Sequence, residues 1–139
     1  MNDLVDRLEI ESVLDEFHAA AAEADEERYF ATLAAEAVFL GTAPGERWAG
    51  TDFREFVHSY FSRGKGWTYT VSERSIDVAR DGRTAWFDET VENEFYGACR
   101  GSGVLQHDGA GWRIEQYNLT IPVPDDLATD LVTRIREIG

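Results

Sequence analysis

The spacing of apolar residues divides the chain into a helical first half and a strand-like second half. Near the N-terminus, five apolar residues recur at helical spacing with acidic residues between them: Ile10, Val13, Leu14, Phe17 and Ala21. Asp25 is a residue type suited to an N-cap, and it predicts the start of a second helix. We expect a short strand over residues 37–42 to follow these two helices.

A third helix is predicted after a loop at residues 42–51, which is marked by Pro, Gly and Thr. Thr51 is its expected N-cap, and Gly64 and Gly66 are expected to end it. Five apolar residues form an uninterrupted helical stripe: Phe53, Phe56, Val57, Tyr60 and Phe61.

After this helix the hydrophobic period changes from 3.6 to 2, which predicts strands. The four strand-like segments are residues 67–79, 84–95, 98–107 and 112–121. Because short turns join them, we expect an antiparallel meander. In the first and last segments the apolar positions change parity, and a bulge near each change would keep them on one face. The predicted sheet is therefore strongly curved.

Pro122 and Pro124 end the last strand, and Asp125 or Asp126 is the expected cap of a short C-terminal helix. The helix has an apolar stripe made of Leu127, Leu131, Val132, Ile135 and Ile138. The order of elements predicts one domain over residues 1–139 in the α+β class. In it, N-terminal helices pack on a curved antiparallel sheet to form a cone.

The charge balance excludes several kinds of partner. There are 27 acidic and 13 basic residues, giving a formal charge of −14, which repels nucleic acid and anionic membranes. Residues 1–40 hold eleven acids against two arginines, a net −9, so the excess is expected on a helical surface. Cys99 is single and no signal-peptide pattern or long apolar run is present, so we expect a cytoplasmic protein.

Several motifs resemble a known family. They are DEFHAAAAEAD (15–25), FLGTAPGERW (39–48), GWTYTV (66–71), AWFDE (85–89), CRGSGVL (99–105) and WRIEQYNLTIPVPDD (112–126). Together with the order of elements, they look like the SnoaL-like branch of the nuclear transport factor 2-like superfamily. The resemblance implies a cone with a pocket between sheet and helices, usually in a homodimer. It does not imply one activity, because the superfamily includes ketosteroid isomerases, polyketide cyclases, dehydratases and trafficking adaptors.

Glu89 is the first candidate for chemistry. Adjacent strand residues point to opposite faces, and Glu89 shares its parity with the apolar Ala85, Phe87 and Val91, whereas Asp88 does not. Glu89 is therefore expected inside the cone, where burial would raise its pKa and suit it to proton transfer. The alternative is a structural role, in which Glu89 pairs with Arg100 or a bulge turns it outward.

Two other charged or titratable residues are candidates beside Glu89. Arg100 lies in a strand-like segment, where it could bind a substrate carboxylate or neutralise nearby glutamates. His18 lies beside the apolar face of the first helix, where it could act as a base at the pocket or simply sit at the edge of the core.

Four aromatic residues could form a pocket wall for a flat or steroid-sized ligand, or could be ordinary core: Trp48, Trp67, Tyr69 and Tyr117. Asn118 faces away from the apolar set by parity, although a bulge could bring it into the cavity. Cyclases of the SnoaL type are expected to use an acid in this late part of the sheet. Here the corresponding residues are the amides Gln116 and Asn118, which counts against copying that mechanism.

No metal-ligand spacing, nucleotide-binding motif or nucleophile elbow occurs in the sequence, so neither a metal nor a cofactor is expected. The favoured hypothesis is a homodimer whose pocket binds a small apolar or aromatic molecule. If it is an enzyme, isomerisation, cyclisation or dehydration by proton transfer is expected, with Glu89 and His18 as catalytic residues. The alternative is a non-catalytic interaction or ligand-binding module whose acidic helices dock a partner.

Overall fold

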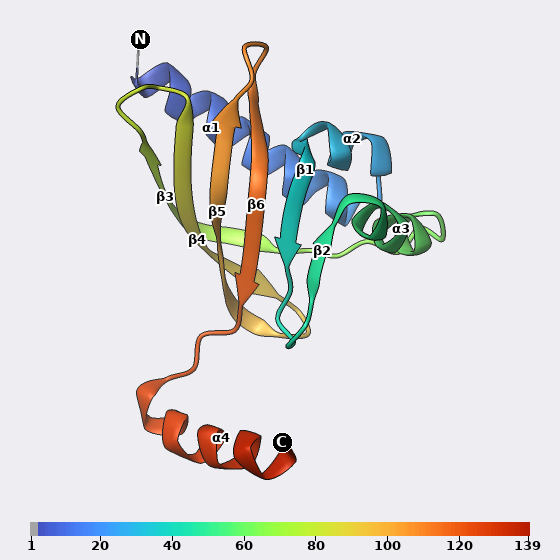
Figure 1. Cartoon of the computed structure of the whole chain (residues 1–139), viewed down its shortest axis with the longest axis vertical. Coiled ribbons are helices and arrows are strands. Elements are labelled where there is room, and N and C mark those ends of the chain that lie inside the picture. Colours follow the sequence, from blue (N-terminus) through green and yellow to red (C-terminus); the bar gives the residue numbers. More distant parts are fainter. Residues whose placement is uncertain (1–2) are drawn as a thin grey trace.

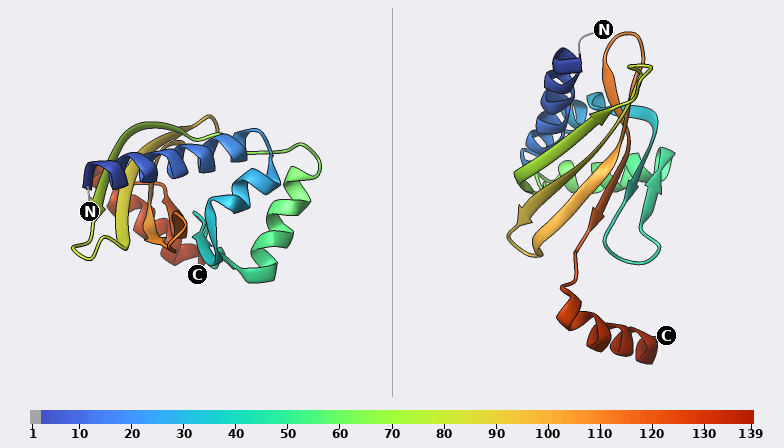
Figure 2. Two further views of the ribbon diagram at one scale, coloured as in Figure 1. Left: turned by 90° about the horizontal axis from the view of Figure 1, so that it is seen from above. Right: turned by 90° about the vertical axis from the view of Figure 1, so that its left-hand side faces the viewer.

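The computed structural model describes residues 3–139 (Figure 1). Its elements are, in chain order, α1 (Asp3–Ala22), α2 (Glu26–Ala31), β1 (Leu33–Leu40), β2 (Arg47–Ala49), α3 (Gly50–Phe61), β3 (Thr70–Val78), β4 (Thr84–Asn93), β5 (Gly97–His107), β6 (Trp112–Thr120) and α4 (Asp125–Ile138). The helices α1, α2 and α3 lie against one side of a curved sheet, as the two views of Figure 2 show. This arrangement confirms the predicted α+β cone.

The sheet has six strands in the order β2-β1-β6-β5-β4-β3. The four strands from β3 to β6 form the expected antiparallel meander. Strand β1, by contrast, pairs in parallel with β6, which makes the sheet mixed rather than purely antiparallel. A parallel pair requires a long crossover, and here the crossover contains α3 and three strands of the meander. Hydrophobic periodicity carries no information about such a distant pairing.

The two parity changes in the sequence coincide with shifts in strand register. Val71 faces Val91 and Glu73 faces Thr90, so Ser72 is the extra residue in β3. In β6 the register to β5 shifts around Glu115. Each bulge lets the apolar residues on both sides of it face the helices, which confirms the predicted curvature.

The helix starts are less well predicted than the helices themselves. Asp25 caps α2 as expected, and its Oδ1 accepts a hydrogen bond from the Arg28 backbone NH at 3.2 Å. The prediction that Thr51 caps α3 is wrong, because the helix begins at Gly50 after Ala49. Neither Asp125 nor Asp126 caps α4, since both lie inside its first turn, where acids favour the helix dipole.

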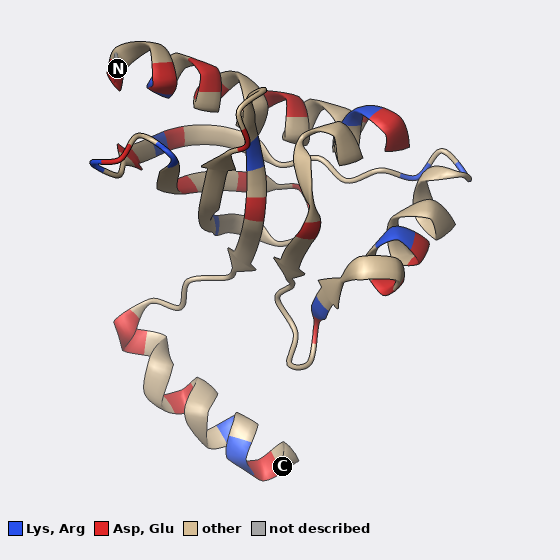
Figure 3. Ribbon diagram, turned by 45° about the horizontal axis from the view of Figure 1, so that its top comes forward, with Lys and Arg blue, Asp and Glu red and all other residues tan. Residues whose placement is uncertain are grey.

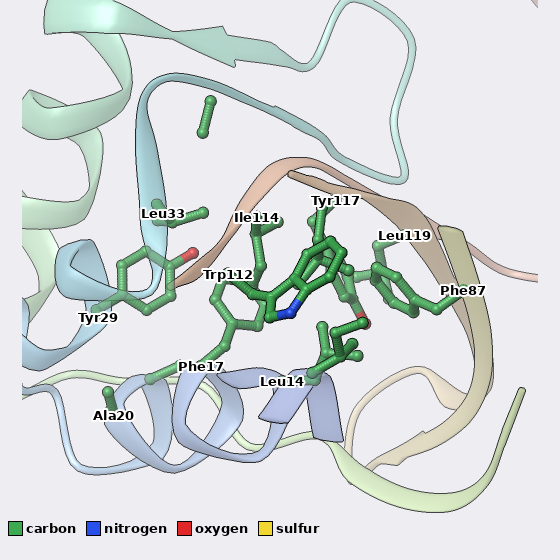
Figure 4. Close-up of a cluster of buried hydrophobic side chains, with 14 of the residues drawn as sticks. Leu14, Phe17, Ala20, Tyr29, Leu33, Phe87, Trp112, Ile114, Tyr117 and Leu119 are labelled. Atoms are coloured by element: carbon green, nitrogen blue, oxygen red, sulfur yellow. The ribbon is translucent and has the colours of Figure 1, made fainter. Parts of the chain in front are cut away.

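The core lies between α1 and the concave face of the sheet (Figure 4). Leu14 and Phe17 of α1 point toward Trp112 and Tyr117 of β6. Phe17 stacks on Tyr29 of α2 with ring centroids 4.9 Å apart, and its ring lies 5.0 Å from that of Tyr117. Aromatic rings thus fill much of the cone interior.

Helix α4 extends away from the cone after an extended segment at residues 121–124 (Figure 1). None of its residues is buried. Its apolar stripe is exposed, with Leu127, Leu131, Val132, Ile135 and Ile138 between 40% and 87% accessible. The predicted helix therefore exists, but its apolar face is left uncovered by the rest of residues 3–139.

Acidic residues recur along α1 (Figure 3). Part of their charge is neutralised, because Arg28 contacts Glu16 at 2.8 Å and Glu23 at 2.9 Å. Among residues 3–139, no helix has both the length and the apolar character needed to cross a lipid bilayer.

Candidate functional site

Glu89 points into the cone from β4, as its parity predicts. Along this strand Ala85, Phe87, Glu89 and Val91 are buried, and the residues between them are exposed or half-buried. The side chain of Glu89 is 0% accessible. A fully buried carboxylate needs compensating partners, because leaving it unpaired in an apolar interior is costly.

Three side chains from three elements meet the Glu89 carboxylate. On one oxygen, Oε2, it accepts a hydrogen bond from His18 Nε2 of α1 at 2.6 Å and another from the Tyr117 hydroxyl of β6 at 2.8 Å. On the other oxygen, Oε1, it accepts a hydrogen bond from Arg74 Nε of β3 at 2.7 Å. We call these four residues the Glu89 cluster.

Arg74 links the Glu89 cluster to the acidic surface of α1. Its Nη1 contacts Asp15 Oδ1 at 2.8 Å and Glu11 Oε1 at 3.1 Å, while its side chain is only 6% accessible. Its Nη2 is buried and has no hydrogen-bond partner among the described residues. The guanidinium therefore ties helix to sheet.

The predicted rise in the pKa of Glu89 is wrong. Burial alone would raise this pKa, but the hydrogen bonds and charges of His18 and Arg74 outweigh burial and hold it below its ordinary value. In contrast, burial and the neighbouring Glu89 raise the pKa of Tyr117, so its hydroxyl remains a donor. The cluster stabilises an ionised carboxylate.

Arg100 does not pair with Glu89, so the structural alternative in which these two residues form an ion pair is wrong. It is exposed on β5 opposite Thr90, a residue of the outer face, whereas Glu89 lies opposite Gly101. Arg100 and Glu89 therefore lie on opposite faces of the sheet. His18, in contrast, is buried at the edge of the core with its ring nitrogen on Glu89.

A separate cavity of about 220 Å³ lies between β1, α3 and the residues preceding β3. Its lining residues are Phe39, Gly41, Thr42, Glu46, Phe56, Trp67, Tyr69, Tyr96 and Leu119. We call it the aromatic cavity, since five of these nine carry aromatic rings. Its volume is below the ~300–1,000 Å³ typical of sites for drug-sized ligands, so it fits a molecule smaller than the steroid-sized ligand considered above.

Two of the four predicted aromatic wall residues, Trp67 and Tyr69, line this cavity. Trp48 does not line the aromatic cavity, but it stacks on the lining residue Phe56 with ring centroids 4.4 Å apart. Tyr117 is buried behind Phe39, on which its ring stacks at 5.7 Å. Asn118 is half-buried opposite Ser102 and does not line the aromatic cavity.

Glu46 and Tyr69 are the polar side chains of interest in the aromatic cavity. Burial, together with the nearby Cys99, Tyr96 and Glu46, raises the pKa of Tyr69 to about 12. The Tyr69 hydroxyl therefore stays protonated at neutral pH. Glu46 accepts a hydrogen bond from the Ala43 backbone NH on Oε1 at 2.7 Å.

Sequence reasoning missed Arg74 and Glu46, for different reasons. The turn at Asp81-Gly82 sets the β3–β4 register, and counting outward from it pairs residue 74 with residue 89. That signal was present in the sequence. Glu46 lies in the predicted loop, and no periodic pattern reveals the short strand β2 that turns it toward the cavity.

No group of three or more His, Cys, Asp or Glu within residues 3–139 is arranged to hold a metal ion. The side chains of the cavity offer aromatic faces, hydroxyls and one carboxylate. Chemically, this arrangement can bind an organic molecule and donate or accept hydrogen bonds.

Comparison with known proteins supports the fold assignment. The chain resembles a proposed aromatic ring hydroxylase from Novosphingobium aromaticivorans, with a TM-score of 0.74, 18% identity, and coverage of 89% of this chain and 94% of the other. A proposed dehydratase of the NTF2-like family from Streptomyces avermitilis is similar with a TM-score of 0.75 and 10% identity, and the match covers 88% of this chain and all of the other. A proposed scytalone dehydratase from N. aromaticivorans is similar with a TM-score of 0.72 and 13% identity over 87% of each chain. At these identities the likeness concerns the fold alone.

The search of curated proteins gave no match. A family model, described as SnoaL-like domain, matches residues 10–124. The matched region runs from the middle of α1 to the end of the segment that follows β6, and so includes the whole sheet and both candidate sites. The chain therefore belongs to the SnoaL-like domain family.

Proposed function

We propose that the protein binds a small aromatic or apolar organic molecule in the aromatic cavity. The observation that carries this proposal is the wall itself, in which five aromatic residues and Leu119 line a space of about 220 Å³. Such a wall favours an apolar ring through burial and stacking. The volume favours a ligand on the order of one ring.

A larger depression of about 520 Å³ lies between α1 and the turn from β5 to β6, but it supports a ligand less well. It is lined by the exposed Val5 and Leu8, by Ala110 and Gly111 of the turn and by the first two residues of β6, and Trp112 is the single aromatic residue among them. An open depression excludes water poorly, so it gains little from apolar contact.

Blocking the cavity tests the proposal. Thr42 lines the cavity and is half-buried, so Thr42→Trp should fill the space, whereas Thr129→Trp places the same ring on exposed α4. We expect ligand-observed NMR with a library of single-ring compounds to detect binders for the wild type and for Thr129→Trp, and to lose them for Thr42→Trp. Binding that survives in Thr42→Trp would place the ligand elsewhere.

The Glu89 cluster has two candidate roles, and we propose the structural one. Its carboxylate has no accessible surface, holds three donors and does not line the aromatic cavity. A proton-transfer role for Glu89 and His18 is the second candidate. The 2.6 Å contact between His18 Nε2 and Glu89 Oε2 favours proton transfer, and proton transfer would serve the dehydratase chemistry named for two of the similar structures.

The titration of Glu89 separates these two roles. Carbon-detected NMR of the labelled carboxyl should give a midpoint below the ordinary glutamate value of about 4.3 if the role is structural. A midpoint near neutral pH would instead favour proton transfer, because a catalytic acid or base works best near the operating pH.

We further propose that the protein forms a homodimer in which α4 packs on a second copy of the chain. The exposed apolar stripe of α4 supports this proposal, since single exposed apolar residues are common but a continuous stripe needs a partner. Residues 121–124 separate the helix from the cone and give it reach.

A further inference from the structure

The charge inside the aromatic cavity indicates what kind of ligand it can take. Among the described residues that line it, Glu46 is the sole charged side chain, and no lysine, arginine or histidine joins it. None of the ion pairs found among residues 3–139 involves Glu46. Its negative charge is therefore not neutralised by a protein cation.

The hairpin between β1 and β2 holds the Glu46 carboxylate in place. The Gly41 backbone NH donates to the Glu46 carbonyl oxygen at 2.8 Å, and the Ala43 NH donates to Oε1 at 2.7 Å. A side chain at Gly41 would lie only 3.0 Å from the Glu46 Cβ and Oε1, so the glycine leaves room for this carboxylate. One carboxylate oxygen thus has a protein donor, and no hydrogen bond to the other oxygen, Oε2, is found among residues 3–139.

Aromatic rings flank the carboxylate within the same wall. Trp67 lies 6.0 Å from Phe56 and 4.8 Å from Phe61, so packing fixes the orientation of its ring. The negative face of an aromatic ring attracts a cation, most strongly for tryptophan, and desolvation strengthens the attraction. A fixed carboxylate next to such rings repels an anionic ligand and attracts a cationic one.

We propose that the aromatic cavity selects an organic cation, an ammonium group carried on a small aromatic or alkyl body, with its charge beside Glu46. This inference rests on the proposed function, since it specifies the ligand class for the same cavity. The net charge of −14 agrees with it, because a negative field raises the local concentration of cations.

A pair of ligands with the same shape tests the charge directly. Phenyltrimethylammonium and tert-butylbenzene differ in one central atom, nitrogen or carbon, and hence in charge. We expect the cation to bind the wild type at least about 10-fold more tightly than the neutral compound by NMR titration, the preference expected for a cation–π cage with a carboxylate. Glu46→Gln should reduce this preference to within about 3-fold.

A matched control removes the effect of overall charge. Glu137→Gln changes the net charge by the same amount on exposed α4, so it should keep the preference for the cation. Equal binding of both compounds by the wild type would overturn the cation proposal and leave the aromatic cavity as a ligand site. An unchanged preference in Glu46→Gln would also overturn it. Failure of both compounds to bind would reject the cation proposal and the proposed function together.

Discussion

At the scale of single residues, Glu89 joins α1, β3 and β6 to its own strand through one carboxylate. Removing one partner of a buried ion pair leaves the other charge uncompensated. If Glu89 were neutralised, Arg74 would keep its ion pairs with Glu11 and Asp15 but would lose its buried carboxylate partner. We therefore expect this carboxylate to stabilise the contact between α1 and the sheet, in addition to the apolar core.

Replacing Glu89 by glutamine should lower the free energy of unfolding by about 3–5 kcal/mol, the usual cost of breaking a buried ion pair. Asp88→Asn is the matched control, because Asp88 is the neighbouring residue on the exposed outer face and should change stability by less than about 0.5 kcal/mol. Urea denaturation at pH 7 measures both. Equal effects of the two substitutions would show that the cluster contributes nothing specific.

The depressed pKa of Glu89 also predicts a dependence of stability on pH. A carboxyl whose pKa is lower in the folded state stabilises the fold fully above its unfolded value of about 4.3, and this contribution is lost as the pH falls through the folded value. The stability difference between wild type and Glu89→Gln should therefore shrink between pH 5 and pH 3. A difference that grew on acidification would contradict a lowered pKa.

At the scale of elements, β5 and β6 approach so closely at two glycines that side chains are excluded. A Cβ at Gly101 would lie 2.0 Å from the Tyr117 hydroxyl oxygen, and one at Gly103 would lie 1.9 Å from the Gln116 carbonyl oxygen. The missing side chains of these two glycines leave room for the Tyr117 hydroxyl and for the backbone of β6.

Gly101→Ala should therefore destabilise the protein by about 1–3 kcal/mol through overpacking. Tyr117→Phe removes the atom that clashes most, so the double variant should lose less stability than the sum of the two single variants. Thermal or urea denaturation of the wild type, the two single variants and the double variant measures the coupling free energy between the two positions. Strict additivity would mean that Gly101 does not accommodate the Tyr117 hydroxyl.

Helix α4 gives a second prediction at this scale. Leu131→Asp with Ile135→Asp places two charges on the apolar stripe, which is exposed in the part of the chain that the structure describes. We expect sedimentation of the wild type to give a dimer at micromolar concentration and the double variant to give a monomer of unchanged fold. Thr129→Asp and Thr133→Asp together form a control with the same added charge. A monomeric wild type would reject the proposed dimer.

Features of the fold that depend on neighbouring residues could be predicted from the sequence, and features that depend on distant segments could not. Alternation along β4 placed Glu89 inward, and the parity changes located the bulges near Ser72 and Glu115, because both depend on neighbouring residues. The parallel contact of β1 with β6 could not be predicted, since it joins segments far apart in the chain. The pairing of Arg74 with Glu89 is different, because the turn at Asp81-Gly82 sets the register of this hairpin and the pairing could have been read from the sequence.

At the scale of the whole molecule, the excess of acidic residues should oppose folding through repulsion. The 27 acids outnumber 13 basic residues, and many acids lie along α1. The buried Arg74–Glu89 pair is screened by salt less than exposed charges are. Raising sodium chloride from about 10 to 150 mM, which shortens the Debye length from ~30 to ~8 Å, should therefore raise the urea midpoint. A lower midpoint would show that exposed ion pairs outweigh the repulsion.

Tyr117 connects the two sites described above. Its hydroxyl is bonded to Glu89, and its ring stacks on Phe39, which forms part of the wall of the aromatic cavity. A change at the carboxylate is thus transmitted mechanically, through one rigid ring, to a surface that the ligand would touch. Weaker ligand binding in a Glu89 variant would then report a loosened wall, and it would not by itself identify a residue that contacts the ligand.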